Sequence, residues 1–273
     1  MILINGKPAT TIQATDRGLH YGDGLFETIE VIQAQPVFLT QHLARLEAGC
    51  SVLKIPFPDK ALLLNEVTQL CQNISHGVIK IILTRGVGGR GYRQPDIINT
   101  TRYIALHPYP DYPESYKTKG ISTRFCETRL GINPLLAGLK HNNRLEQVLA
   151  RAEWQDEVQE GLMMNLHDEV IEGTMTNLFV VKNQQLMTAK ISQSGVNGIM
   201  RQIIIEQSKS LPNVVKEMTL SIDDVLCADE LFVTNSVIGV WPITRLEDKS
   251  YVIGDVTQQV ISLLSTAKAE DIK

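Results

Sequence analysis

The apolar positions in the first third of the chain alternate between a period of two and helical spacing. Residues 2–4, followed by Asn5-Gly6, predict a strand and a hairpin turn. The alternation over 26–32 predicts a half-buried strand, and 36–39 are expected to form its return strand. The same reasoning predicts a helix capped by Thr40, a helix from Asp59 through Asn73, and strands at 78–83 and 103–106.

Beyond that third, strand patterns at 121–127, 161–166, 176–181 and 230–234 alternate with helical patterns near 144–157, 199–210 and 255–266. Residues 107–113 hold three prolines in seven positions, and proline fixes φ and lacks an N–H donor. We expect this stretch to be neither helix nor inner strand. The expected fold is α/β (α+β), with a small N-terminal domain over 1–107, a proline-rich linker over 108–119 and a larger C-terminal domain over 120–273.

The overall composition narrows the class of protein. Of the 273 residues, 43% are hydrophobic and 21% are charged, which is ordinary for a soluble globular chain. A net charge of −4 gives no reason to expect a nucleic-acid or anionic-membrane partner. No run of eighteen apolar residues predicts a membrane span, and the N-terminal Met-Ile-Leu-Ile lacks the basic region of a signal peptide. The scattered cysteines predict free thiols in a reducing cytoplasm, and the dispersed histidines predict no metal site.

Lys140 lies just ahead of a predicted helix, in Leu-Lys140-His-Asn-Asn143-Arg-Leu-Glu146. Asn143 and Glu146 have the spacing of a capping box. The positive end of a helix lowers the pKa of a nearby amine, and a lysine that forms a Schiff base must be partly unprotonated near neutral pH. Most lysines are merely solvated, so the neighbouring motifs decide between the two interpretations.

Two further strings supply an acid and backbone donors. Glu172 precedes a strand pattern, and it is either a loop acid beside Gly173 or a carboxylate that keeps a pyridine nitrogen protonated. The string Gly195-Val-Asn-Gly198-Ile-Met-Arg201 opens a predicted helix, whose exposed N–H groups can bind phosphate. An amine, an acid and phosphate-binding N–H groups are together what holding pyridoxal phosphate requires.

The stretch 85–92 contains a literal G-x-G-x-x-G after a strand pattern. A dinucleotide-binding loop should open a helix, whereas Pro95 and the residues after it do not look helical, so we reject that interpretation. Arg90 can grip a carboxylate through two hydrogen bonds, and Tyr92 can add a hydroxyl. The stretch therefore predicts either a flexible turn or a loop that binds a carboxylate-bearing substrate.

Together these strings resemble the fold type IV pyridoxal-phosphate enzymes, the family of branched-chain and D-amino-acid aminotransferases. The resemblance rests on 136–146, 172–179 and 195–201, on Gly-Gly-Arg-Gly-Tyr at 88–92, and on the N-terminal string 16–28. It is strongest to the lyases of this family. It implies a two-domain fold with the cofactor in the interdomain cleft, a homodimer, and conversion of 4-amino-4-deoxychorismate to 4-aminobenzoate and pyruvate in folate biosynthesis.

The resemblance also implies which residues hold the cofactor. Lys140 is expected to bind the aldehyde and to act as acid and base. Glu172 is expected to face the ring nitrogen, and Asn177 to begin the strand beneath the ring. The remaining expected cofactor contacts bind the phosphate, and they are Arg45, the N–H groups of Ile199 and Met200, and the pair Asn235-Ser236.

For the substrate, the resemblance implies that Thr28 relays a proton and that Arg90 and Tyr92 bind carboxylates. Asn142 departs from the leucine expected after Lys-His in this family. A D-amino-acid or branched-chain aminotransferase on the same scaffold would use Lys140 in the same way and is the alternative. A non-catalytic binding protein is a third hypothesis, which the retained lysine and acid disfavour.

Overall fold

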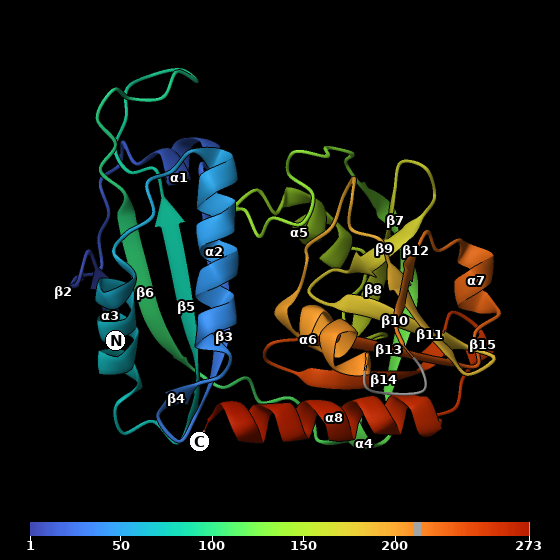
Figure 1. The fold of residues 1–273 in the computed structure, drawn as a ribbon. Coiled ribbons are helices and arrows are strands. Elements are labelled where there is room, and N and C mark those ends of the chain that lie inside the picture. Colours follow the sequence, from blue (N-terminus) through green and yellow to red (C-terminus); the bar gives the residue numbers. More distant parts are fainter. Residues whose placement is uncertain (210–213, 273) are drawn as a thin grey trace. The chain divides into compact units, whose positions relative to one another are not determined.

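The computed structural model describes residues 1–209 and 214–272, and the chain forms two compact units (Figure 1). The first unit comprises Met1–Pro110, Leu139–Asn143 and Glu270–Lys273, and the second comprises Asp111–Gly138 and Arg144–Ala269. Each unit contains both a sheet and helices, which confirms the predicted α/β class. The short segment that holds Lys140 groups with the first unit, although it lies far along the chain.

The first unit is built on an antiparallel sheet with the order β2-β1-β6-β5-β3-β4. The long strands β3 and β5 pair over their whole length, from Gly24↔Thr84 to Ile32↔His76. The strands are β1 Ile2–Ile4, β2 Lys7–Pro8, β3 Gly24–Ile32, β4 Gln35–Pro36, β5 His76–Thr84 and β6 Thr101–Pro108.

Two long helices cover one face of this sheet. The helices of the unit are α1 Arg17–Tyr21, α2 Leu39–Leu53 and α3 Lys60–Cys71. Leu43 of α2 and Leu63 of α3 share a buried core with Ile29 of β3 and Ile79 of β5. Because neighbouring strand residues point to opposite faces, Phe26 and Thr28 of β3 lie on the face away from these helices.

The helix starts in this unit test two predicted caps. Asp59 caps α3 as predicted, since its Oδ1 accepts from Ala61 N at 2.7 Å. The predicted Thr40 cap is wrong, because α2 already begins at Leu39, with Phe38 at φ 55° in the cap position. Phe38 N donates instead to Asp271 Oδ2 at 2.5 Å. A carboxylate near the end of the chain thus supplies the acceptor that local sequence assigned to a threonine.

The strand β6 continues to Pro108, but its last two residues pair only with β5, so the expectation that 107–113 contain no inner strand is not contradicted there. Pairing with β1 reaches only to Ala105, whereas pairing with β5 continues to Gly77↔Pro108. Proline is tolerated there because that side of the strand needs no N–H donor. The early start of α2 also shortens the predicted return strand at 36–39 to Gln35–Pro36.

The second unit has a mixed sheet with the order β12-β11-β10-β13-β14-β7-β8-β9, with β15 beside β14. The sheet closes on itself, because β9 also pairs with β10 through Asn177↔Glu172. Its strands are β7 Ile121–Leu130, β8 Glu160–Asn165, β9 Val170–Gly173, β10 Asn177–Lys182, β11 Gln185–Ala189, β12 Lys216–Met218, β13 Glu230–Asn235, β14 Gly239–Leu246 and β15 Lys249–Ser250.

The core of the second unit includes apolar side chains of the central strands, among them Leu178, Val233 and Trp241. Its helices are α4 Ser115–Thr118, α5 Leu145–Arg151, α6 Ile199–Ser208, α7 Ile222–Leu226 and α8 Asp255–Asp271. The helix predicted over 144–157 is shorter, because the chain turns after Arg151 and buries Trp154. Position 210, the predicted end of the α6 helix, lies outside the described residues. No helix in the described part of the chain is long and apolar enough to cross a membrane.

Candidate active site

The Lys140 segment adds to the edge of β3 like a short extra strand. Phe26 N donates to Lys140 O at 2.9 Å, Asn142 N donates to Gly24 O at 3.0 Å, and Leu25 bridges to His141. The Lys140 Nζ lies 4.4 Å from the centroid of the Phe26 ring. Backbone bonds on both sides of His141 therefore hold the segment in register, with Lys140 opposite Phe26 and on the same face.

The predicted capping box after Lys140 is wrong. Arg144, not Asn143, occupies the cap position of α5 and makes no side-chain cap bond. Asn143 Nδ2 donates to Gly22 O at 3.2 Å, and Glu146 Oε1 accepts from Gly131 N at 2.9 Å. Both side chains are recruited by residues distant in sequence, which spacing along the chain does not reveal.

Thr28 shares the Phe26 face of β3 and pairs directly with Lys80 of β5. The Lys80 Nζ lies 5.5 Å from the Phe26 ring centroid. One face of the first unit therefore collects the predicted amine of Lys140, the predicted hydroxyl of Thr28 and a second ammonium that the sequence did not single out.

Arg45 of α2 is held by a buried acid on the opposite face of β3. Its Nε and Nη2 donate to Glu27 at 2.8 and 2.5 Å, and His42 Nδ1 lies 2.6 Å from the same carboxylate. Burial alone would raise the pKa of Glu27, but the charges and hydrogen bonds of Arg45 and His42 lower it to about 2. The guanidinium of Arg45 is thus oriented by a partner that is ionised at neutral pH.

His42 itself is completely buried, and burial lowers its pKa although the charge of Glu27 opposes the change. A neutral ring at pH 7 donates its Nδ1 proton to Glu27. Across residues 1–209 and 214–272 its Nε2 has no hydrogen-bond partner. A bare nitrogen lone pair is cheaper to bury than an unpaired N–H⁺, so the geometry and the direction of the pKa change agree.

The loop that carries Arg90 and Tyr92 contains no helix, which confirms the rejection of a dinucleotide-binding loop. Arg17 Nη1 donates to Gly91 O at 3.0 Å, and Gly91 N donates to Tyr21 Oη at 3.0 Å. The Tyr92 side chain is 87% exposed and meets Tyr21 edge to face. The loop is therefore anchored at its tip while Arg90 and Tyr92 stay accessible to a ligand.

In the second unit, Glu172 is nearly buried at the end of β9 and its carboxylate is held in place. Its Oε2 accepts from Val196 N at 2.8 Å and from Asn177 Nδ2 at 3.4 Å. Burial lowers the pKa of Arg144, and the negative charge of Glu172 opposes that effect. A carboxylate with a fixed orientation suits a protonated ring nitrogen.

The start of α6 approaches Glu172 through Asn177. A Cβ on Gly198 would lie 2.0 Å from Asn177 Oδ1, so only glycine allows this approach. Gly198 occupies the cap position and supplies no side-chain cap to the first N–H groups, which include those of Ile199 and Met200. The predicted acid and the predicted phosphate-binding helix start are therefore neighbours within one unit.

Asn235 is the last residue of β13 and leads into the turn after it. The preceding residue, Thr234, pairs with Asn177 of β10, so this turn lies close to the Glu172–Asn177 pair. Asn235 Oδ1 accepts from Val237 N at 2.8 Å and from Ile238 N at 2.9 Å, and its Nδ2 donates to Met175 O. Both ends of this amide thus shape the turn that carries Ser236. A phosphate contact from this pair would come from the turn and from Ser236.

Residues 24–246 match the family described as amino-transferase class IV. The chain belongs to this family.

Relatives of this class IV aminotransferase family member cover nearly the whole chain. An aminodeoxychorismate lyase of Vibrio harveyi is 38% identical over 97% of this chain and 100% of its own length. The crystal structure of 4-amino-4-deoxychorismate lyase from Pseudomonas aeruginosa matches with a TM-score of 0.93 and 41% identity, over 97% of this chain and 98% of that one. A putative branched-chain-amino-acid aminotransferase of Methanocaldococcus jannaschii is 29% identical over 95% of this chain and 93% of its own length.

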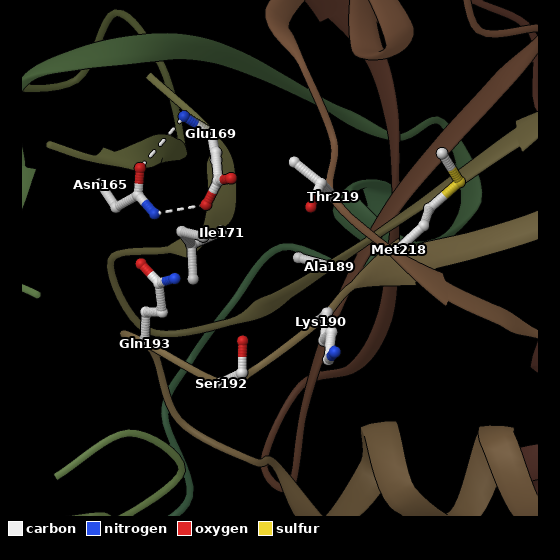
Figure 2. A pocket seen from close by; sticks show the side chains of 9 residues that line it. All are labelled: Asn165, Glu169, Ile171, Ala189, Lys190, Ser192, Gln193, Met218 and Thr219. Carbon is white, nitrogen blue, oxygen red and sulfur yellow. Dashed lines mark hydrogen bonds between the residues drawn. The ribbon is translucent and has the colours of Figure 1, made fainter. Parts of the chain in front are cut away.

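A cavity of about 190 Å³ lies elsewhere in the second unit (Figure 2). Figure 2 shows that the Asn165 amide faces Glu169, with Nδ2 donating to Glu169 Oε2 at 2.7 Å. None of the site residues predicted from the sequence lines this cavity, and we assign it no ligand. The residues that line it are Asn165, Glu169, Ile171, Ala189, Lys190, Ser192, Gln193, Met218 and Thr219.

Sequence reasoning missed three charged groups of this class IV fold: Lys80, Arg144 and the buried acid Glu160. Lys80 and Arg144 stand in ordinary strand and loop contexts. Glu160 precedes the all-buried strand residues of β8, and a lone acid directly before an apolar run is the one local signal that could have drawn attention to it.

Proposed function

We propose that this protein is a pyridoxal-phosphate-dependent aminodeoxychorismate lyase, which converts 4-amino-4-deoxychorismate to 4-aminobenzoate and pyruvate. The observation that best supports pyridoxal phosphate as the cofactor is the buried, fixed carboxylate of Glu172, which lies beside the uncapped start of α6. The choice of reaction is supported by nearly full-length similarity to two lyases, at 38% and 41% identity.

The residues present fit pyridoxal phosphate. Glu172 can pair with a protonated ring nitrogen. The N–H groups of Ile199 and Met200 and the Asn235-Ser236 turn can donate hydrogen bonds to the phosphate. Arg45 adds a guanidinium that Glu27 already orients. We propose that the Lys140 amine binds the aldehyde of this cofactor.

When bound, the cofactor would supply an electron-accepting ring conjugated to the substrate amine. Glu172 would keep the ring nitrogen protonated, and Lys140 would remove the proton from the amine-bearing carbon, so that the neighbouring carbon–oxygen bond can break. Thr28 would relay that proton from Lys140 to the departing enolpyruvate, which becomes pyruvate, and the ring that remains is aromatic 4-aminobenzoate.

The substrate carries two carboxylates, and the exposed loop offers groups that suit them. Arg90 provides a guanidinium fork for bidentate binding, and Tyr92 provides a hydroxyl. Arg17 and Tyr21 hold the loop at Gly91, so Arg90 can be placed without ordering the whole loop anew. This pre-organisation lowers the entropy lost when a ligand binds.

The same proposal includes a homodimer in the cytoplasm. Three apolar side chains of the short helix α5 are exposed, with Leu145 at 76% and Val148 and Leu149 each at 61%. Their spacing places them on one side of the helix, and exposed apolar patches of this kind mark protein interfaces. A second copy of this chain is the partner we propose. Cytoplasmic location rests on the four cysteines, all free thiols.

The second candidate is a branched-chain or D-amino-acid aminotransferase. It is favoured by the 29% identity to the putative branched-chain-amino-acid aminotransferase of Methanocaldococcus jannaschii, and by 25% identity to a D-alanine aminotransferase of Listeria monocytogenes over 90% of this chain. Lys140, Glu172 and Arg45 would serve an aminotransferase equally well.

One assay separates the two functions. Purified protein with pyridoxal phosphate and 4-amino-4-deoxychorismate should release pyruvate and 4-aminobenzoate in equal amounts. If neither product forms, and the protein instead transfers an amino group from D-alanine or a branched-chain amino acid to 2-oxoglutarate, the lyase proposal is wrong. A colourless protein that binds no pyridoxal phosphate would overturn both enzyme functions.

A further inference from the structure

A fully buried carboxylate stands at the start of β8 and takes no part in the proposed chemistry. Glu160 is 0% exposed and accepts five hydrogen bonds. Its Oε1 accepts from Gly161 N at 2.9 Å, Thr174 N at 3.0 Å and Thr174 Oγ1 at 2.6 Å. Its Oε2 accepts from Met175 N at 3.2 Å and Thr176 Oγ1 at 2.9 Å.

Four of these five donors belong to one loop, residues 174–176, which connects β9 to β10. The loop is partly exposed, with Met175 at 43%, but its donors to Glu160 face a carboxylate that is fully buried, where an unpaired N–H group is costly. Glu160 supplies acceptors from a neighbouring strand, and Thr174 N also donates to Gly161 O at 3.1 Å. The fit is tight, because a Cβ on Gly173 would lie 2.2 Å from Thr176 Oγ1 and 2.8 Å from Glu160 Oε2.

The loop that Glu160 holds joins the two residues that close the sheet. Glu172 lies in β9 one residue before its end at Gly173, Asn177 begins β10, and the two pair with each other. The middle of the loop reaches the next turn as well, because Met175 O accepts from Asn235 Nδ2 at 3.1 Å. A shift of the loop would therefore move the acid, its amide partner and the Asn235-Ser236 turn together.

We propose that Glu160 is a positioning residue, which sets the geometry of Glu172, Asn177 and the Asn235-Ser236 turn for pyridoxal phosphate. The inference rests on the proposed function for the identity of the ligand. Glu160 touches neither cofactor nor substrate, and it acts through the 174–176 loop.

The chemistry of the side chain explains why an acid is needed. Five donors require two oxygen atoms that only accept, and a glutamate carboxylate provides both. A glutamine has one such oxygen, and its NH₂ group would face N–H and O–H donors. An aspartate is one methylene shorter. Glu160→Gln should therefore displace the loop while changing the volume of the side chain very little.

The test compares Glu160→Gln with Glu230→Gln in the full-length chain. Glu230 is a matched control, because it is a buried acid of the same unit that accepts from Val256 N and Thr257 N at the start of α8. Titration with pyridoxal phosphate gives its dissociation constant and the absorbance spectrum of the bound form, and thermal unfolding of the cofactor-free protein gives stability.

The expected result is a dissociation constant for pyridoxal phosphate raised roughly tenfold in Glu160→Gln, with a changed spectrum, as expected for the loss of hydrogen bonds to a charged group. Glu230→Gln should lower thermal stability but leave both cofactor readouts within about twofold of wild type. Unchanged cofactor binding in Glu160→Gln, or an equal loss in both variants, overturns the proposal.

A milder pair decides the matter if Glu160→Gln does not fold. Thr174→Val removes the 2.6 Å bond to Glu160 and leaves the carboxylate in place. Thr244→Val is its control, because Thr244 Oγ1 donates to Lys119 O at 3.3 Å and lies on β14, which β7 separates from β8. Weaker cofactor binding in Thr174→Val alone supports the proposal, and equal binding in both overturns it. A wild-type chain that binds the cofactor but forms no 4-aminobenzoate would refute the lyase function and leave this comparison intact.

Discussion

Glu27 allows a quantitative test of how the first unit holds Arg45. Its carboxylate is 1% exposed, and although burial raises its pKa, the partners Arg45 and His42 lower it from 4.5 to about 2. That difference corresponds to about 3 kcal/mol of stability from the ionised form. Because the folded-state pKa is depressed, this stabilisation is complete above the unfolded value of 4.5 and is lost as the pH falls towards 2.

Glu27→Gln removes the negative charge and leaves the Arg45 guanidinium without its ionic partner. We expect the variant to be less stable than wild type by about 3 kcal/mol at pH 7, and the difference to shrink as the pH falls below 4.5. Other carboxylates titrate in the same range, but they are common to both proteins and cancel in the comparison.

The measurement is urea unfolding of the cofactor-free protein over a series of pH values, with hydrogen exchange followed in peptides from β3 and α2. Hydrogen exchange reports on the first unit directly, even if the two units unfold separately. Glu47→Gln, at an exposed acid of the same helix, should change stability by no more than about 0.5 kcal/mol. A Glu27→Gln difference below about 1 kcal/mol at pH 7, or one that stays constant down to about pH 3, would refute the reasoning.

The remaining predictions concern the proposed site. Lys140→Ala should lower turnover at least about 1000-fold in the pyruvate assay, because the proposed acid and base is gone, and normal turnover would refute the mechanism. Arg90→Ala should raise KM roughly tenfold with a smaller change in kcat. The control is Arg93→Ala in the same loop, which should change neither constant, because the exposed Arg93 side chain pairs with Asp96. An unchanged KM in Arg90→Ala would show that Arg90 does not bind a substrate carboxylate. Gly198→Ala places a Cβ 2.0 Å from Asn177 Oδ1 and should destabilise the protein by about 1–3 kcal/mol in thermal unfolding, so an undisturbed variant would contradict the close approach.

Local signals gave most of the elements correctly and failed where a distant group intervened. Asp59 caps α3 through its own neighbours, so the sequence was sufficient there. Thr40 and the Asn143–Glu146 box have equally good local spacing, yet neither forms the predicted cap. Asp271 supplies the acceptor at the start of α2, and the Glu146 carboxylate accepts from Gly131 N instead. Hydrogen-bond partners far apart in sequence compete with nearby ones on equal terms once the chain is folded.

The candidate site divides in the same way. The strings around Lys140, Glu172 and Gly198 carry chemistry that residue type and order can suggest, because an amine, an acid and a glycine-led helix start occur together, although each alone has commoner structural uses. Their roles remain predictions. The structure adds that Glu172 and Asn177 are directly paired strand residues and that Asn177 touches Gly198.

The sequence by itself determined the α/β class, the order of the main strands and helices, and the family resemblance, because hydrophobic periodicity and short motifs are properties of neighbouring residues. Only the tertiary structure decided which carboxylates become buried anchors. Glu27 and Glu160 look like ordinary acids along the chain, and each acquires its role from donors on other elements. A buried charge is tolerated only where such partners converge, and that convergence is created by the fold.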